Sequence, residues 1–301
     1  MTSPATLKLT SNLLTLELAP HAGGSIATFR LLKNDQAIDL MRPASEQALE
    51  QANARATACF PLVPFSNRIE NGEFEYDGKQ VRLPLNFAPH PHPLHGQGFQ
   101  RPWQLIEHTA TSAAIVYEHA GNENGWPWIY RAEQRFTLSG DTLIASISLQ
   151  NTGPETMPAG IGFHPFFPRT TGVQLNIGLG QVWIPDDNNM PKTLSVIPDE
   201  WRFINNRSLQ SVVLDHCFTD WDGLARIYWP EHKTGLEITH SGLLKHMVIY
   251  VPDNEDFFCI EPVSHVNNAI KLAANGVENT GQLDLPPGET VYAEVRYKVI
   301  T

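Results

Sequence analysis

The sequence predicts an all-β fold, a large antiparallel β-sandwich with little helix. Two observations predict it. Segments in which apolar and polar residues alternate recur along the whole chain, and turns rich in proline (23 residues) and glycine (21 residues) separate them. Such alternation is typical of strands that bury one face. Neither a Pro/Ser-rich linker nor a repeat of fixed period divides the 301 residues, so we expect one domain over residues 1–301.

Three segments predict β-hairpins. Residues 7–20 alternate on both sides of Ser11 and Asn12, residues 72–85 turn at Asp77-Gly78, and residues 130–153 turn around 139–141. An Asp-Gly pair between alternating segments is among the strongest hairpin signals. Further strands are expected at 225–230, 236–242, 247–252, 257–262 and 291–300.

One segment, residues 44–58, predicts a helix. Its alanine, glutamate and glutamine content favours helix, and Pro61 lies just beyond its end. We therefore expect a single helix in a chain that is otherwise built from strands.

Composition and charge exclude several classes of protein. Apolar residues make up 42% of the chain, which is enough for a sizeable core, and the net charge of −11 argues against nucleic-acid binding. The sequence has no continuous stretch of ~18 apolar residues, so no membrane span is expected. The N-terminal residues alternate, and they do not form the basic and apolar blocks of a signal peptide.

The three cysteines, Cys59, Cys217 and Cys259, are odd in number and widely spaced. They match neither a disulfide framework nor the paired knuckles of a zinc site. A reducing compartment is the simplest interpretation. We expect a cytoplasmic protein that is a monomer or a homodimer.

Four groups of polar residues are candidates for chemistry. They are Asn67-Arg68 in FSNRI, the histidines His90, His92 and His95, the lone His164 in GIGFHPFF, and two later carboxylates, Asp215 and Glu261. His90 and His92 lie in a proline-rich loop and are expected to be solvated. His95 comes before Gly96 and Gly98, which let the backbone approach a ligand closely.

Each of these residues also has an ordinary structural explanation. By itself, His164 would be a packed core histidine whose backbone is held extended by Pro165. Glu261 ends the buried-strand pattern FFCIE, and carboxylates are rarely buried without a partner, so a structural ion pair is one interpretation. Arg68 could bind a ligand or form a surface ion pair, and Asp215 could lie in a turn.

The residues alone leave two other chemistries open. The HxH pattern of His90 and His92 lacks the following glutamate of a cupin-type metal site, although two histidines and a carboxylate from distant strands could bind a metal. Glu261 and Asp215 could be the two carboxylates of a glycosidase. Four tryptophans suit a sugar-stacking groove and a sandwich core equally well, namely Trp103, Trp126, Trp128 and Trp221.

Taken together, the clusters resemble the aldose 1-epimerase (galactose mutarotase) family, from about residue 15 to the C-terminus. The matching segments, in the family's order, are NRIENGEFEYDG at 67–78, LHGQGF at 94–99, His164 with its proline and phenylalanines, Asp215 before an aromatic segment, and Glu261. The resemblance implies a β-supersandwich that interconverts the α and β anomers of an aldose without a cofactor or a metal.

The resemblance also implies roles for individual residues. Glu261 resembles the family's general base and His164 its general acid. The residues that match sugar-holding positions are Arg68, His95, Asp215 and, beside Arg68, Asn67. The chemistry agrees, because opening a hemiacetal requires a base to remove the C1 hydroxyl proton and an acid to protonate the ring oxygen.

Three features depart from the common pattern of the family and leave the preferred sugar open. Pro165 follows the histidine, Gln97 stands in the LHG block, and the last block reads IEPVSH. A free hexose is the leading expectation. The alternatives are a hexose phosphate, for which Arg101 and Arg169 are near in sequence, and a non-catalytic sugar-binding module on the same scaffold.

Overall fold

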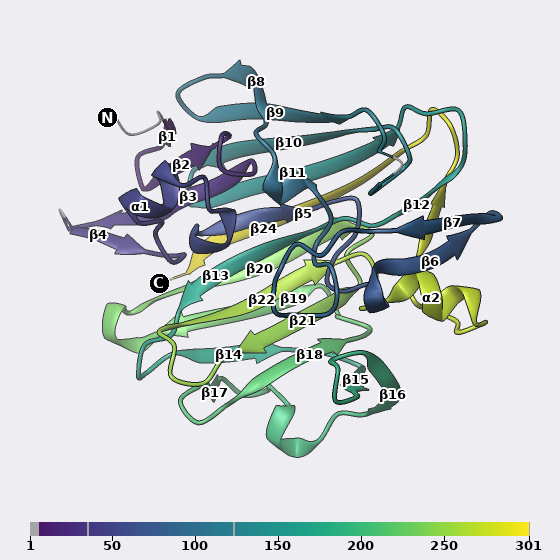
Figure 1. Cartoon of the computed structure of the whole chain (residues 1–301). Coiled ribbons are helices and arrows are strands. Elements are labelled where there is room, and N and C mark those ends of the chain that lie inside the picture. The colour runs from purple at the N-terminus through teal and green to yellow at the C-terminus, as the bar shows by residue number, and fades with distance from the viewer. Residues whose placement is uncertain (1–5, 35, 123, 301) are drawn as a thin grey trace.

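The computed structural model describes residues 6–34, 36–122 and 124–300, and its strands form two large sheets that stack face to face (Figure 1). Neighbouring strands pair antiparallel in both sheets. The predicted all-β sandwich is therefore confirmed.

The larger sheet has eleven strands, and its central strands carry the candidate residues. Their order is β1 (Leu7–Thr10), β2 (Leu14–Ala19), β3 (Ser25–Lys33), β5 (Cys59–Leu62), β13 (Gly162–Pro168), β22 (Phe257–Val263), β21 (His246–Val251), β18 (Leu214–Phe218), β15 (Gln181–Pro185) and β16 (Pro191–Val196), with β4 (Gln36–Asp39) paired to β3. Strands that are neighbours in this sheet are often far apart in the sequence, which brings distant side chains together.

The second sheet has nine strands and supports the first. Its order is β17 (Arg207–Ser208), β14 (Gln174–Ile177), β19 (Leu224–Trp229), β20 (Thr234–Gly242), β24 (Thr290–Ile300), β11 (Thr142–Asn151), β10 (Tyr130–Ser139), β9 (Ser112–His119) and β8 (Gln104–His108). Two small two-stranded sheets pair β6 (Glu73–Tyr76) with β7 (Lys79–Arg82), and β12 (Met157–Ala159) with β23 (Leu283–Leu285).

All three predicted hairpins are present, as β1–β2, β6–β7 and β10–β11. In the second hairpin, Asp77 and Gly78 have φ of 47° and 73°, and two positive φ angles are what a type I′ turn requires. The five later predicted strands correspond to β19, β20, β21, β22 and β24.

The predicted helix over residues 44–58 is wrong in extent. The helix α1 covers only Glu46–Glu50, capped by the Ser45 side chain, and a 3-10 turn follows at Ala54–Ala56. Ala52 has a left-handed backbone (φ 50°), which no α-helix can continue through. A second helix, α2 (Ala269–Ala274), was not expected. No helix in the described ranges is long and apolar enough to cross a membrane.

The main hydrophobic core fills the space between the two sheets. For example, Phe29 on β3 and Tyr297 on β24 meet edge to face, with ring centroids 6.5 Å apart. The four tryptophans considered above for sugar stacking are all buried in this core, at 5% exposure or less. They therefore stabilise the sandwich, and none of them lines the cavity described below.

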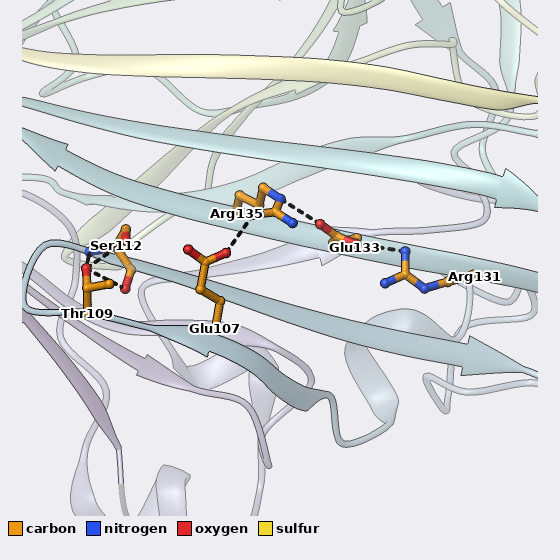
Figure 2. Close-up of polar contacts among 6 residues, drawn as sticks. All are labelled: Glu107, Thr109, Ser112, Arg131, Glu133 and Arg135. Carbon is orange, nitrogen blue, oxygen red and sulfur yellow. Dashed lines mark hydrogen bonds and ion pairs between the residues drawn. The ribbon is translucent and has the colours of Figure 1, made fainter.

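The outer face of the nine-stranded sheet carries a network of charged side chains (Figure 2). Arg135 on β10 reaches Glu107 on β8 at 3.0 Å and Glu133 at 2.6 Å, and Glu133 also pairs with Arg131 at 2.8 Å. Exposed pairs of this kind contribute little stability, about 0–1 kcal/mol each. Their effect is to give β10 one polar face, which matches the strict alternation in its sequence.

Candidate functional site

Five neighbouring strands of the larger sheet project side chains away from the main core. Residues along a strand alternate between faces, so on β13 the side chains of Phe163 and Phe167 enter the main core, whereas those of His164 and Phe166 lie on the opposite face. The same alternation on β22 sends Phe258 and Ile260 inward and Cys259 outward. Glu261, two residues beyond Cys259, shares its face.

A cavity of about 510 Å³ opens on this face of the larger sheet. All six residues that the sequence nominated line it, and they are Asn67, Arg68, His95, His164, Asp215 and Glu261. They come from β13, β18, β22 and two loops, and the cavity is large enough for a small ligand.

His164 and Glu261 are in contact in the cavity. Nε2 of His164 lies 3.3 Å from Oε1 of Glu261, and both side chains are almost fully buried. The imidazole is held by aromatic rings, since it stacks on Phe60 at 4.5 Å and on Phe166 at 4.6 Å between centroids. The strand order explains the pairing, because β13 and β22 are adjacent in the sheet.

Burial acts in opposite directions on the two groups. It raises the pKa of Glu261 well above its usual value, and the nearby charge of Asp215 raises it further while Arg68 acts against both. Burial lowers the pKa of His164 to about 3, and the positive charge of Arg42 acts in the same direction. The 3.3 Å contact therefore joins a neutral imidazole to a carboxyl group, although its distance alone would suit an ion pair.

Each member of the pair keeps one polar atom without a partner. Nδ1 of His164 and Oε2 of Glu261 are buried, and neither atom has a hydrogen-bond partner within the described ranges. Buried polar atoms are normally satisfied, so an unsatisfied carboxylate oxygen at a cavity wall is an unusual feature that a ligand could complete.

Arg68 and Asp215 form an ion pair in the same cavity. Nη2 of Arg68 lies 3.3 Å from Oδ2 of Asp215, and Nη1 of Arg68 donates to Oδ1 of Asn67 at 3.1 Å. Asp215 is on β18 and not in a turn, contrary to the local interpretation of its sequence. Arg68 is a cavity residue and does not form a surface ion pair, because only 11% of its side chain is exposed.

His95 is fixed by the loop that carries Asn67. Nδ1 of His95 accepts from the backbone N–H of Asn67 at 3.1 Å, and the backbone N–H of His95 donates to the Asn67 carbonyl at 2.9 Å. An accepting Nδ1 leaves the proton of the neutral ring on Nε2. Burial keeps the pKa of His95 well below its usual value, with smaller contributions from His164 and Arg68. His95 is therefore a neutral hydrogen-bond donor at the cavity wall.

Gly96 allows this close approach between the two loops. It has φ of 71°, and a Cβ atom there would lie 2.1 Å from the backbone oxygen of Val63. Only glycine fits here, and the close approach is to the Val63 backbone, whereas the sequence analysis expected an approach to a ligand.

The segment that follows Glu261 anchors the loop that carries Arg68. His265 accepts the Ser66 N–H on Nε2 at 3.1 Å, while its Nδ1 lies 2.7 Å from the Val266 carbonyl. The backbone N–H of Asn268 donates to the Arg68 carbonyl at 2.8 Å. The unusual IEPVSH block thus includes a buried histidine that positions its neighbours without lining the cavity.

Sequence reasoning missed several residues of the cavity wall. Besides Phe60 and Phe166, these are Arg42, Arg55, Phe87, Tyr250 and Phe257, together with Asn53 and Asn189. Tyr250 faces the cavity because it is opposite Asp215 in the β18–β21 register, a relationship that strand alternation could have predicted. Arg42 lies in an irregular segment and Arg55 in the single 3-10 turn Ala54–Ala56, and neither has a periodicity that marks an inward-facing side chain.

The two histidines expected to be solvated behave differently from that expectation. His90 is half-buried at the cavity wall, where its ring stacks on Phe87 at 4.7 Å. His92 is 3% exposed and accepts the Asn71 N–H on Nδ1 at 2.9 Å. The loop is therefore an ordered wall, and His92 is one of its structural residues.

One group of side chains within the described ranges could hold a metal ion. His164, Cys259 and Glu261 offer ligand atoms that lie within 4.8 Å of one another. Burial raises the pKa of Cys259 well above its usual value, which disfavours the thiolate that metals bind. The group also includes both members of the His164–Glu261 pair, so a metal there would bind the atoms that form their contact.

Comparison with known proteins identifies the family. The sequence profile of the family described as aldose 1-epimerase matches residues 6–298. The chain belongs to the aldose 1-epimerase family. Its resemblance, inferred above from short motifs, therefore extends over nearly the whole chain.

Several family members are similar to this chain over most of their length. The uncharacterized protein YphB of Escherichia coli K12 is 30% identical over 268 residues, which are 86% of this chain and 88% of YphB. The crystal structure of a candidate aldose 1-epimerase from the same strain has a TM-score of 0.86 at 29% identity and covers 98% of this chain and 99% of that one. Galactose mutarotase of Rattus norvegicus is 23% identical over 202 residues, 60% of this chain and 58% of the rat protein.

Proposed function

We propose that this aldose epimerase interconverts the α and β anomers of a hexose by acid–base opening and closing of the ring. The observation that carries the proposal is the buried contact between His164 Nε2 and Glu261 Oε1, 3.3 Å apart in one cavity. A module that only binds sugar needs no such pair. A glycosidase would need a second free carboxylate, but Asp215 is engaged by Arg68.

In the proposed reaction, Glu261 removes the proton of the C1 hydroxyl while His164 donates a proton to the ring oxygen. The C1–O5 bond breaks and the C1 oxygen becomes a carbonyl. Rotation about C1–C2 presents the other face of the carbonyl, and the reverse proton transfers close the ring as the other anomer. Each residue therefore serves as acid in one direction and as base in the other.

The reaction starts from ionised Glu261 and protonated His164, whereas burial favours the neutral form of each residue. Ionised Glu261 with protonated His164 has the same net charge as neutral Glu261 with neutral His164, and one proton moved between the two residues relates the two states. The pair thus titrates as a unit, and its apparent pKa values belong to the pair. Activity requires the pair to carry this one shared proton, so it is lost when pH rises through the raised pKa of Glu261.

The remaining polar residues suit the binding of hydroxyl groups. Arg68 and the Nε2–H of His95 could donate to oxygens that carry negative charge as the ring opens. Asp215 holds Arg68 in place through an ion pair, and Asn67 Oδ1 accepts a hydrogen bond from the other terminal nitrogen of the guanidinium. None of these assignments requires a metal or a cofactor.

The test is the exchange rate between anomers, followed by NMR for a panel of free hexoses and hexose phosphates. The parent protein should accelerate exchange for at least one sugar in the panel. His164→Asn and Glu261→Gln should each lower kcat by about 10²–10⁴-fold and change sugar binding by only a few fold. Full activity in both variants, or no acceleration by the parent for any sugar, refutes the proposal.

A further inference from the structure

We propose that the cavity contains an anion subsite, formed by Arg55 with Arg42, and that its preferred substrate is an aldose carrying a phosphate or carboxylate away from C1. This inference rests on the proposed function. It concerns the substrate class of the same site. The evidence for it comes from Arg42 and Arg55, two cavity residues that the sequence analysis did not identify as candidates.

The first observation is the charge balance of the cavity wall. Three arginines line it, Arg42, Arg55 and Arg68, against two carboxylates, Asp215 and Glu261. Arg68 is paired with Asp215, and the second carboxylate, Glu261, lies against His164. Arg42 and Arg55 are thus not neutralised by any acid of the wall. Such an excess is notable in a chain with 32 acidic and 21 basic residues, because its overall surface is acidic.

The guanidinium group of Arg55 is available to bind an anion. Within the described ranges, no hydrogen bond or ion pair reaches its guanidinium group, which lies over the ring of Phe87 at 4.1 Å. Stacking on an aromatic ring leaves the edge of a guanidinium free, and this edge can bind phosphate or carboxylate with two parallel hydrogen bonds.

Arg42 is held rigidly beside Arg55. Nη2 of Arg42 donates to the carbonyls of Arg55 at 2.7 Å and Thr57 at 2.9 Å, and its guanidinium lies over the rings of Phe166 at 3.8 Å and Phe257 at 4.6 Å. The hydrogen bond to Arg55 fixes the backbone that carries the second arginine. Glu255 and Asp256 are near enough to favour the charge of Arg42, but neither forms an ion pair with it within 4.0 Å.

The position of the subsite relates it to the reacting pair. Arg42 lies over Phe166, the ring on which His164 stacks, so a guanidinium and the acid–base pair flank the same aromatic side chain. Arg55 is more exposed and stands near Phe87 and His90. A sugar whose C1 contacts Glu261 would extend its far end toward these side chains.

Arg101 and Arg169 lie close in sequence to the site motifs and were considered above as ligands for a phosphate. Neither of them lines the cavity. Arg169 donates to the backbone carbonyls of Pro252, Leu209 and Val212. Arg101 is exposed and lines a different, smaller hollow beside Gln97 and Trp126. Arg101 is therefore a matched control, since no hydrogen bond or ion pair within the described ranges engages its guanidinium either.

The experiment measures kcat/KM for anomer exchange with three sugars: glucose, glucose 6-phosphate and glucuronate. We expect the parent protein to prefer at least one anionic sugar over glucose by about tenfold or more, and Arg55→Ala to reduce this preference by about tenfold. Arg55→Lys should retain part of it, and Arg101→Ala should retain all of it. The preferred arm, phosphate or carboxylate, identifies the anion.

Two outcomes overturn the inference: equal kcat/KM for glucose and both anionic sugars in the parent protein, or an equal loss for all three sugars in Arg55→Ala. Calorimetric binding of glucose 6-phosphate and glucuronate to the parent and Arg55→Ala separates the two proposals. If no sugar exchanges faster but an anionic sugar binds through Arg55, the subsite stands and the proposed reaction fails. If glucose alone exchanges faster, the reaction stands and the subsite fails.

Discussion

Glu261→Gln should lower activity and increase stability in the same protein. The substitution keeps the size of the side chain and removes its ability to exchange a proton, so anomer exchange should fall by about 10²–10⁴-fold, or ~3–5 kcal/mol in the activation free energy. The stability effect follows from burial, which holds the pKa of Glu261 well above the value of 4.5 that it has when exposed.

The sign of the stability effect depends on pH. Between pH 4.5 and the raised pKa, folded Glu261 keeps a proton that the unfolded chain has released, so the free energy of unfolding of the parent decreases by up to ~1.4 kcal/mol per pH unit from this residue. This contribution is fully present below pH 4.5 and is lost as pH rises through the raised pKa. Glutamine does not titrate. The variant should gain up to ~2.7 kcal/mol over the parent when pH rises from 4.5 to 6.5.

Urea denaturation at pH 4.5, 6.5 and 8 measures this difference. Because the remaining titratable groups are common to both proteins, their contributions largely cancel when variant and parent are compared. Glu278→Gln is the control, since Glu278 is exposed and forms no ion pair within the described ranges. A stability difference that does not change with pH, or more than a tenth of parental activity in the Glu261 variant, would refute the reasoning.

Three further predictions concern the surroundings of the pair. Asp215→Asn removes a charge that raises the pKa of Glu261, so in the kcat/KM profile the loss of activity at high pH should begin at lower pH; an unchanged profile contradicts this. Gly96→Ala should lower the free energy of unfolding in urea by several kcal/mol, because its Cβ would clash with the Val63 oxygen 2.1 Å away. Gly140→Ala is the control, since Gly140 has φ of 61° but open space around it, and it should cost about 1–2 kcal/mol. Equal losses in the two variants would disprove the clash. His265→Ala should cost about 1–3 kcal/mol by leaving the Ser66 N–H unpaired, and it should flatten the loss of stability that the parent shows from pH 6.5 down to 4. That loss follows because burial lowers the pKa of His265 to about 4, so the unfolded chain binds a proton that the folded protein excludes.

The sequence predicted the parts of the fold that local patterns determine. Alternation and turn residues identified the hairpins and late strands correctly, because both depend on residues close together in the chain. The helix over 44–58 failed in extent because composition cannot reveal that Ala52 turns left-handed. That turn leads into the segment where Arg42 binds the Arg55 and Thr57 carbonyls, which is a tertiary contact.

The candidate site was predicted in part for similar reasons. Glu261 and His164 could be identified as candidates because they are polar residues in apolar segments, and the family resemblance implied that they act as a pair. Arg42 and Arg55 carry no comparable local signal. Their positions depend on which loops lie side by side once the sheet is complete, and no sequence periodicity encodes that arrangement.

The order of strands in the larger sheet has a consequence for folding. The cavity needs β5, β13, β22, β21 and β18 as consecutive neighbours, although these strands are spread over residues 59 to 263 of the chain. Contacts between such distant segments form late and slowly, because a long loop must close before each pairing is gained. Catalytic activity regained during refolding should therefore report completion of the entire sheet, and no fragment that lacks one of these strands should recover it.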